Sequence, residues 1–449
     1  MFYATKIISV FTHPRPQAAL CQWPLRGDAS TLPLTQLRRR LMVLTDAPGV
    51  KNAMQTRRMI LASGAGAAAV ALGGLVLRAW DRGVWSHGDG SAYAPWKDWQ
   101  GTIADALKRP LRAAILAANP HDTQPWLFQM GDSRITLFAD RARNLGTFDP
   151  FRREMHLGLG AAIENLVLAA RAFGFAAKVA PTAGTLSLSP DDTPAAAAHI
   201  ALTPTPAARD ALFQAIPRRH TNRGPYRADQ TIVAGILRRL ADLATDDVVR
   251  IVFIDDKKAR SELGALIVEA TVRIIGDPQM SADSARWFRT GRREIAAHRD
   301  GVTIDTAGFS PFMTAASKLL PDLDAASADR YWLSSTRETQ VSSAPVFGLI
   351  LVRDRLDAPS ALQAGRVWQR LHLAATAEGL AAQPLNQPVE CIDRDAMLGR
   401  ADTFGSAIAK FVGAPGWEPT FVFRLGVAEH AAKPSPRRPV EELIRTTAN

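Results

Sequence analysis

Hydrophobic positions recur with two different spacings along residues 95–430. Spacings of three and four residues, typical of one buried face of a helix, predict helices over residues 97–118, 158–177 and 361–380. Compact apolar runs between polar residues predict strands over residues 134–139, 248–254, 346–352 and 420–425. Helices therefore alternate with a small number of strands, which indicates an α+β fold class.

Two of the apolar helical segments are copies of each other. Residues 160–177 and 365–382 align at a constant offset of 205, and nine of the eighteen positions are identical. Both copies reach a glycine, Gly174 or Gly379, where a helix would end. We interpret the chain as a tandem duplication. Its two halves are expected to pack as the subunits of a dimer do, which makes an intrachain pseudo-dimer.

Charge is concentrated near the N-terminus. The 54 Lys+Arg against 43 Asp+Glu give a net charge of +11, which by itself suggests a nucleic-acid partner. Ten basic and two acidic residues lie within residues 1–80, so this segment carries eight of the eleven net charges. The remainder of the chain is nearly neutral, and we expect no nucleic-acid binding.

Composition excludes several further classes. With 47% apolar and 22% charged residues, the chain is typical of globular proteins and unlike disordered, collagen-like or polytopic membrane proteins. Its two cysteines allow neither a disulfide scaffold nor a cysteine-rich metal site. The HExxH, GxSxG and P-loop motifs are absent from the sequence. We predict no metal ligand and no catalytic side chain.

An arginine pair precedes a long uncharged run. Arg57-Arg58 is followed by residues rich in Ala and Gly, and the next charged residue is Arg78. This arrangement resembles a twin-arginine export signal; a single transmembrane anchor and a buried Ala-rich helix are the alternatives. We expect the twin-arginine translocase as a partner. The location is then exported, either periplasmic or membrane-anchored facing the periplasm.

The export signal defines the first domain boundaries. We assign residues 54–94 to the signal or anchor with its linker. Residues 1–53 are then an extension upstream of a translation start at Met54. The small residues Ala92 and Ala94 form a possible cleavage motif, but Pro95 follows, and proline at this place usually blocks cleavage.

Four short motifs resemble those of the nitroreductase superfamily. In chain order they are a polar loop at residues 117–126 ending in Gln-Pro-Trp, a basic segment at 217–223, Ser-Ala-Pro at 343–345, and a proline-rich basic segment at 434–443. Their order resembles most closely the Acg-like, FMN-binding branch of that superfamily. There, two nitroreductase-like halves lie on one chain.

The resemblance implies a nitroreductase-like fold with halves at residues 95–205 and 206–449. It implies one complete FMN site, because the first half carries the Gln-Pro-Trp loop and the second carries the arginine motifs. For the phosphate it implies Arg219, Thr221 and Arg223 on one side and Arg437 and Arg438 on the other, since guanidinium groups suit a dianion. For the flavin it implies Asn119 and Gln124, with Asp122 beside them and Trp126 packing the loop.

Two positions depart from the family pattern, and each motif has a plainer explanation. Asp122 stands where the family usually has Asn, and Ser435 stands where many members have Lys. Each change makes the net charge around a bound anion more negative. The plainer alternatives are a solvated basic turn at 218–223, an ordinary helix start at 437–438 and a purely structural Gln-Pro-Trp loop.

The functional hypothesis is an FMN-dependent oxidoreductase that passes electrons through the flavin to a nitroaromatic, quinone or similar acceptor. The sequence does not identify the electron donor, because little NAD(P)H exists outside the cytoplasmic membrane. The alternatives are an exported FMN-binding or FMN-sequestering protein without turnover and an interaction module with a dead site. Residues 271–331 have no counterpart in a minimal half, and we interpret them either as a lid or as an extension of the interface between the halves.

Overall fold

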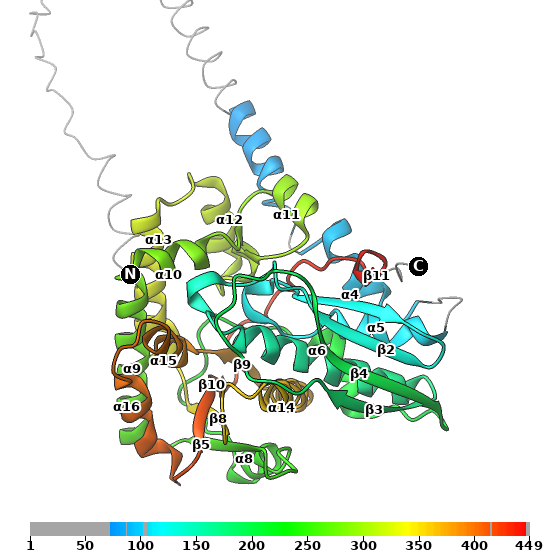
Figure 1. The fold of residues 1–449 in the computed structure, drawn as a ribbon. Coiled ribbons are helices and arrows are strands. Elements are labelled where there is room, and N and C mark those ends of the chain that lie inside the picture. Colours follow the sequence, from blue (N-terminus) through cyan, green and yellow to red (C-terminus); the bar gives the residue numbers. More distant parts are fainter. Residues whose placement is uncertain (1–71, 87, 102–105, 414, 446–449) are drawn as a thin grey trace, which may run out of the picture. The chain divides into compact units, whose positions relative to one another are not determined.

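A computed structural model describes residues 72–86, 88–101, 106–413 and 415–445. The arginine pair and most of the uncharged run lie outside the described residues. In the described part, helices and strands alternate along the chain and assemble two main sheets (Figure 1). No helix among the described residues is long and apolar enough to cross a membrane.

The described residues between 94 and 215 form four α-helices, of which α6 is the longest, and four strands. They are α4 Ala94–Asp98, α5 Arg109–Ala114, β1 Trp126–Met130, β2 Arg134–Ala139, α6 Arg153–Ala172, β3 Phe175–Pro181, β4 Ala195–Pro204 and, after the last strand, α7 Ala211–Ala215. The second half is larger. Its elements are α8 Ala234–Ala241, β5 Val249–Ile254, α9 Lys257–Ile275, α10 Pro278–Ala285, β6 Phe288–Arg289, α11 Arg292–His298, β7 Val302–Thr303, α12 Pro311–Leu319, α13 Ala325–Ser335, β8 Val346–Val352, α14 Ala358–Ala377, β9 Ala381–Pro384, α15 Gln387–Met397, α16 Thr403–Val412, β10 Glu418–Gly426 and β11 Ile444–Arg445.

The two main sheets share one topology. The order in the first is β11-β1-β2-β4-β3, and in the second it is β5-β8-β10-β9. Within each half the strands pair antiparallel in the order first, second, fourth, third. The extra strand β11 comes from the end of the chain and pairs parallel with β1. The second half therefore completes the sheet of the first, and the predicted α+β class with tandem halves is confirmed.

The repeated helices α6 and α14 pack against each other at two glycines. A Cβ atom at Gly160 would overlap the carbonyl oxygen of Leu362, and a Cβ atom at Gly365 would overlap that of Leu157. Both pairs are related by the repeat offset of 205. Close approach of the two backbones therefore requires glycine at the same place in each copy.

Polar contacts across this helix pair follow the same symmetry. The Gln369 amide donates to Asn165 at 2.8 Å, and the Arg370 guanidinium donates to Glu164 at 2.8 Å. Gln369 is the repeat equivalent of Glu164, and Arg370 is that of Asn165. Exchange of partners between equivalent positions is the mark of a two-fold interface, so the helix pair has pseudo-two-fold symmetry.

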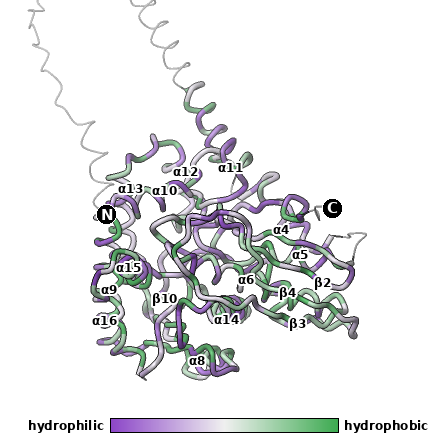
Figure 2. The backbone as a smooth tube through the Cα atoms, in the orientation of Figure 1, coloured by the Kyte–Doolittle hydropathy of each residue, from purple (hydrophilic) through white to green (hydrophobic). Residues whose placement is uncertain are grey.

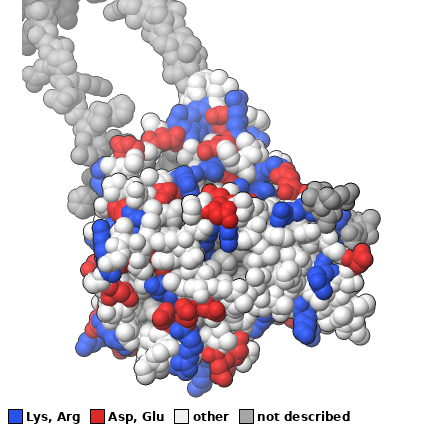
Figure 3. Space-filling view, viewed as in Figure 1, with Lys and Arg blue, Asp and Glu red and all other residues white. Residues whose placement is uncertain are grey.

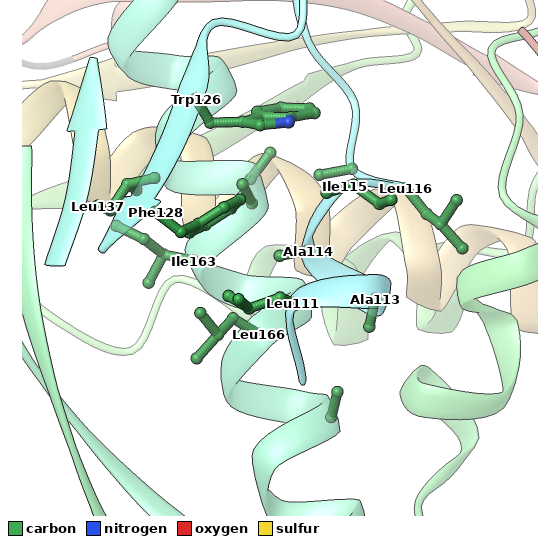
Figure 4. Packing of buried hydrophobic residues seen from close by; sticks show 14 of the residues in the cluster. Leu111, Ala113, Ala114, Ile115, Leu116, Trp126, Phe128, Leu137, Ile163 and Leu166 are labelled. Atoms are coloured by element: carbon green, nitrogen blue, oxygen red, sulfur yellow. The ribbon is translucent and has the colours of Figure 1, made fainter. Parts of the chain in front are cut away.

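Each half has its own apolar core. In the first half, α5 and α6 pack against β1 and β2, and Figure 4 shows Trp126, Phe128 and Ile163 within that cluster. In the second half every residue of β8 is buried. Hydrophobic positions run through both halves and do not gather in one (Figure 2).

One predicted helix is wrong and the others are close. In place of a continuous helix over residues 97–118, α4 ends at Asp98 and α5 occupies only Arg109–Ala114. Pro110 stands in the first turn of α5, the helical position where its missing N–H does no harm. Because proline in the interior would have broken the longer helix, the apolar spacing there reflects two short helices.

Candidate functional site

The loop before β1 holds an unusual backbone conformation. His121, Asp122 and Gln124 have positive φ angles of 46°, 55° and 50°, a region that residues with a side chain seldom adopt. The Asn119 carboxamide holds the loop together: it accepts from the Gln124 backbone N–H at 2.8 Å and donates to Asp122 at 3.3 Å. Strain of this kind persists where the surrounding structure fixes the chain, often at functional sites.

The second component is the chain that leaves α7. Asn222 fixes it, since its backbone N–H donates to the Ala382 carbonyl at 3.2 Å and its side chain to the His430 carbonyl at 2.7 Å. The Arg219 guanidinium is buried, 2% exposed, and donates to the Leu116 carbonyl at 3.1 Å. The half-buried Arg223 donates to the Thr306 carbonyl at 3.2 Å.

The third component is the C-terminal segment before β11. The Arg437 backbone N–H donates to the Ala92 carbonyl at 2.7 Å. Its buried guanidinium donates to the Ser435 hydroxyl at 2.6 Å, forms an ion pair with Asp122 and lies 4.9 Å from the ring centre of Trp96. Arg437 therefore joins the C-terminal segment to the strained loop of the first half.

These three components line one pocket, although they lie up to about three hundred residues apart in sequence. It has about 410 Å³ of atom-free space, its solvent-filled mouth included. Six of the nine residues predicted for the site line it: Asn119, Asp122, Arg219, Thr221, Arg223 and Arg437. Ser435, which the sequence analysis marked as a departure from the family pattern, also lines it. The lining residues that were not predicted are Ala118, His220, Gly301, Val302, Thr306 and Lys433.

Gln124, Arg438 and Trp126 do not line this pocket. The buried Gln124 carboxamide is used within the protein: it accepts from the Arg438 backbone N–H at 2.8 Å and donates to the Arg299 carbonyl at 2.8 Å. The Arg438 guanidinium lies 4.0 Å from Asp140. Trp126 is fully buried in the first core (Figure 4). These three side chains lie outside the pocket lining and contact other parts of the protein.

The pocket has more positive than negative charge. Among the described residues, neither Arg219 nor Arg223 has an ion pair, and Asp122 is the one carboxylate lining the pocket. Burial lowers the pKa of Arg219 to about 9, and the Arg437 guanidinium adds to the decrease. The buried Nε atoms of Arg219 and Arg437 have no hydrogen-bond partner. A buried cation without an ion-pair partner, as Arg219 is among the described residues, is costly, so this pocket is suited to an anion.

Asp122 is itself disfavoured as an anion. Burial raises its pKa to about 7, although the neighbouring Arg437 guanidinium and the Asn119 amide oppose the rise. The carboxyl therefore titrates near neutral pH. Its charge, when present, competes with any bound anion for Arg437.

A segment of the interval 271–331 closes one wall of the pocket. The Gly301 backbone N–H donates to the Asp122 carbonyl at 3.1 Å. Asp300 pairs with Arg289 at 2.9 Å and also with Arg143 of the first half. This wall is attached to the strained loop by backbone and charged contacts. No short motif marks it in the sequence, because its contacts with the first half join residues more than 150 positions apart.

The chain is similar to two curated proteins of Mycobacterium tuberculosis. It is 28% identical over 354 residues to "Putative NAD(P)H nitroreductase Rv3131" (strain ATCC 25618 / H37Rv), and the alignment covers 76% of this chain and 90% of that protein. It is 27% identical over 359 residues to "Putative NAD(P)H nitroreductase acg" of the same strain, which covers 77% of this chain and 96% of that protein. No family model matches the chain.

Solved structures with a related arrangement have low overall similarity. A nitroreductase from Anabaena variabilis aligns over 75% of this chain and 91% of its own, with 10% identity and a TM-score of 0.43. The FMN-dependent nitroreductase NfnB from Mycobacterium smegmatis aligns over 53% of this chain and 98% of its own, with 18% identity and a TM-score of 0.34. Both curated relatives carry nitroreductase in their names, in agreement with the resemblance that the sequence motifs suggest.

Proposed function

We propose that this protein is an FMN-dependent oxidoreductase. Its similarity to a protein named as an NAD(P)H nitroreductase, which extends over 76% of the chain, supports the proposal. The observation that carries the proposal is the pair Arg219 and Arg223, which line the pocket without any ion pair among the described residues. An FMN phosphate supplies the dianion that these groups need. The resemblance predicts the same residues for the phosphate.

Each side of the pocket suits a different part of FMN. Arg219, Thr221 and Arg223 are suited to the phosphate, with Arg437 approaching from the C-terminal segment. Asn119 offers neutral hydrogen-bonding groups beside the strained loop, as the polar edge of a flavin requires. Bound FMN supplies transfer of an electron pair, and the protein supplies position and electrostatics. Both halves of the chain contribute to the one pocket.

The donor and acceptor follow from the relatives by analogy. Their names specify NAD(P)H and nitroreductase activity, so we propose a nicotinamide donor and a small nitroaromatic or quinone acceptor. The test is anaerobic reduction of the purified holoprotein by NADPH, by NADH and by dithionite, followed at the flavin absorbance bands. Bleaching by either nicotinamide supports turnover. Absence of flavin bands in a protein reconstituted with FMN would contradict the proposal.

A second candidate is an FMN-binding protein without turnover. The observation that favours it is the closed wall: the Gly301 N–H and the Arg299 carbonyl are both bonded to the loop that carries Asp122 and Gln124. A wall held in this way limits access to a bound flavin. Bleaching by dithionite and not by nicotinamides would favour this candidate over the reductase.

Replacing Asp122 with Asn should tighten FMN binding, and the gain should depend on pH. The carboxyl has a raised pKa of about 7, so below pH 7 it is protonated and resembles Asn. Above pH 7 it is ionised and repels the phosphate. We expect about tenfold tighter binding by Asp122→Asn at pH 8, and a smaller gain at pH 6. Quenching of FMN fluorescence measures both affinities; comparison at equal pH cancels the titration of FMN itself.

We also propose export by the twin-arginine translocase, based on Arg57-Arg58 and the uncharged run after them. Replacement of both arginines by lysine should leave the protein in the cytoplasm. Cell fractionation with a cytoplasmic and a periplasmic marker measures the distribution. An unchanged distribution would contradict this route.

A further inference from the structure

Exposed apolar side chains lie where the N-terminal helical residues 74–82 dock on the end of α12. Trp80 is 64% exposed, Leu320 58% and Leu323 61%. We call these three side chains, with Phe312 and Met313 of α12, the N-terminal apolar face. On α12, Thr314 and Lys318 are buried while Phe312 and Met313 are exposed, so the helix turns a polar side inward and an apolar side outward. This is the reverse of a helix that packs only against its own protein.

The N-terminal helical residues are fixed to this face by strong contacts. The Arg78 guanidinium donates to the Leu319 and Leu320 carbonyls, each at 2.7 Å. Arg82 makes a two-point ion pair with Asp322, at 2.9 and 2.7 Å. The buried Lys318 ammonium donates to the Gly83 carbonyl at 2.9 Å. The start of the described chain therefore has a defined place on the body of the protein.

The chain that follows is part of the core and of the pocket. Ala92 and Tyr93 are buried, 3% and 4% exposed, and the Ala92 carbonyl accepts from the backbone of Arg437. The Trp96 indole donates to the Ser435 carbonyl at 2.8 Å. Cleavage after Ala94 would remove buried side chains and a partner of Arg437, so the structure favours a chain that keeps its N-terminal segment.

The sequence before this face points to a lipid bilayer as its partner. Residues 59–77 contain no charged residue, and an uncharged stretch of about this length is the sequence pattern typical of a membrane-attached segment. Most of this run lies outside the described residues. Directly after it come two exposed tryptophans, Trp80 and Trp85, the residue type that favours the membrane–water interface.

Basic groups surround the same place. The Arg292 guanidinium lies 5.0 Å from the ring centre of Trp80, and Arg293 is 94% exposed at its side chain. Lys and Arg side chains gather around these N-terminal residues in the view of Figure 3. Apolar side chains with aromatic and basic neighbours are suited to a surface with anionic headgroups.

We propose that this protein keeps residues 59–77 as a membrane attachment and rests its N-terminal apolar face on the lipid surface. A free apolar face of this kind on a soluble protein would favour association. Contact with a membrane explains why the face is exposed. The pocket is held beside the bilayer, because Ala92 and Trp96 attach it to the same N-terminal segment. The proposal is independent of the flavin assignment.

The test uses the full chain with one environment-sensitive label. In a Cys21→Ser background, in which the buried Cys391 remains, Leu323→Cys and, as a matched control, the 41% exposed Leu398→Cys are labelled with a nitrobenzoxadiazole thiol reagent. The proteins are reconstituted into vesicles of phosphatidylcholine and phosphatidylglycerol in a three-to-one ratio. We expect a blue shift and quenching by spin-labelled lipid at position 323, and neither at position 398.

Three results would overturn the proposal. Vesicles that carry the protein without any shift at position 323 would show an anchored protein with a free face. A shift at position 323 that spin-labelled lipid does not quench would assign the face to a second copy of the chain. A mature protein whose N-terminal residue, determined on membranes from the native host, lies at or after Pro95 would exclude retention of the anchor. Unfolding curves that match those of the unlabelled protein ensure that the variants are folded.

Discussion

Arg219→Ala should lower the affinity for FMN about 100-fold, which corresponds to about 2.7 kcal/mol. Arg219 is the favourable target because, among the described residues, its guanidinium makes one hydrogen bond, to the Leu116 carbonyl, and no ion pair. Its loss therefore removes a partner of the phosphate and leaves no buried carboxylate unpaired. Arg437→Ala is less informative, because it would also free the buried Asp122.

The preceding residue provides a matched control. Arg218 has the same side chain but is exposed and does not line the pocket, so Arg218→Ala should bind FMN as tightly as the unmodified protein. Fluorescence titration of the apoproteins with FMN measures both. If the two variants had equal affinities, the assignment of Arg219 to the phosphate would be wrong.

Gly160→Ala should destabilise the protein by about 3 kcal/mol, near the upper end for overpacking in a core. The new methyl group would overlap the Leu362 carbonyl of the facing helix. Relief requires α6 and α14 to move apart, which loosens the central contact between the halves. Gly365→Ala should cost a similar amount, because its methyl group meets Leu157 in the equivalent way. Urea unfolding followed by circular dichroism measures both.

The direction in which each substitution changes the free energy of unfolding tests the close helix crossing. Gly to Ala in a free helix is stabilising by up to about 1 kcal/mol. Gly235 of α8 has open space around it, its nearest such neighbour being the Arg239 side chain at 3.9 Å, so Gly235→Ala should stabilise or be neutral. Stabilisation by all three substitutions would disprove the close helix crossing.

The local pattern of hydrophobic residues predicted those helices and strands in which the spacing of apolar positions is regular. Strands over residues 134–139 and 346–352 match β2 and β8 to the residue. The repeat offset of 205 identified two helices that do pack together, since duplicated residues must meet equivalent partners. The prediction of one helix over residues 97–118 was wrong because Pro110 and Gly101 interrupt an apolar spacing that spans two helices.

The site was predictable only in part. Charged residues in motifs marked one side of the pocket, and Arg219 and Arg437 do lie around it. The interval 271–331 stood out as an insertion, but Gly301 and Thr306 within it could not be identified as lining residues, since neither carries a charge and both are brought there by long-range folding. Gln124 and Trp126 belong to the Gln-Pro-Trp motif, and their side chains contact the protein itself: Gln124 donates to the Arg299 carbonyl, and Trp126 is buried in the first core, as expected for a residue that packs the loop.

The covalent link between the two symmetric helices changes how this protein can evolve. In a dimer of identical chains every mutation is copied into both partners, so a change that improves one surface must be tolerated at the other. Here Glu164 and Gln369 occupy equivalent places with different side chains, which a single gene for two identical subunits could not encode. Freed from that constraint, one half could gain the segment that walls the pocket without the same change being imposed on the other.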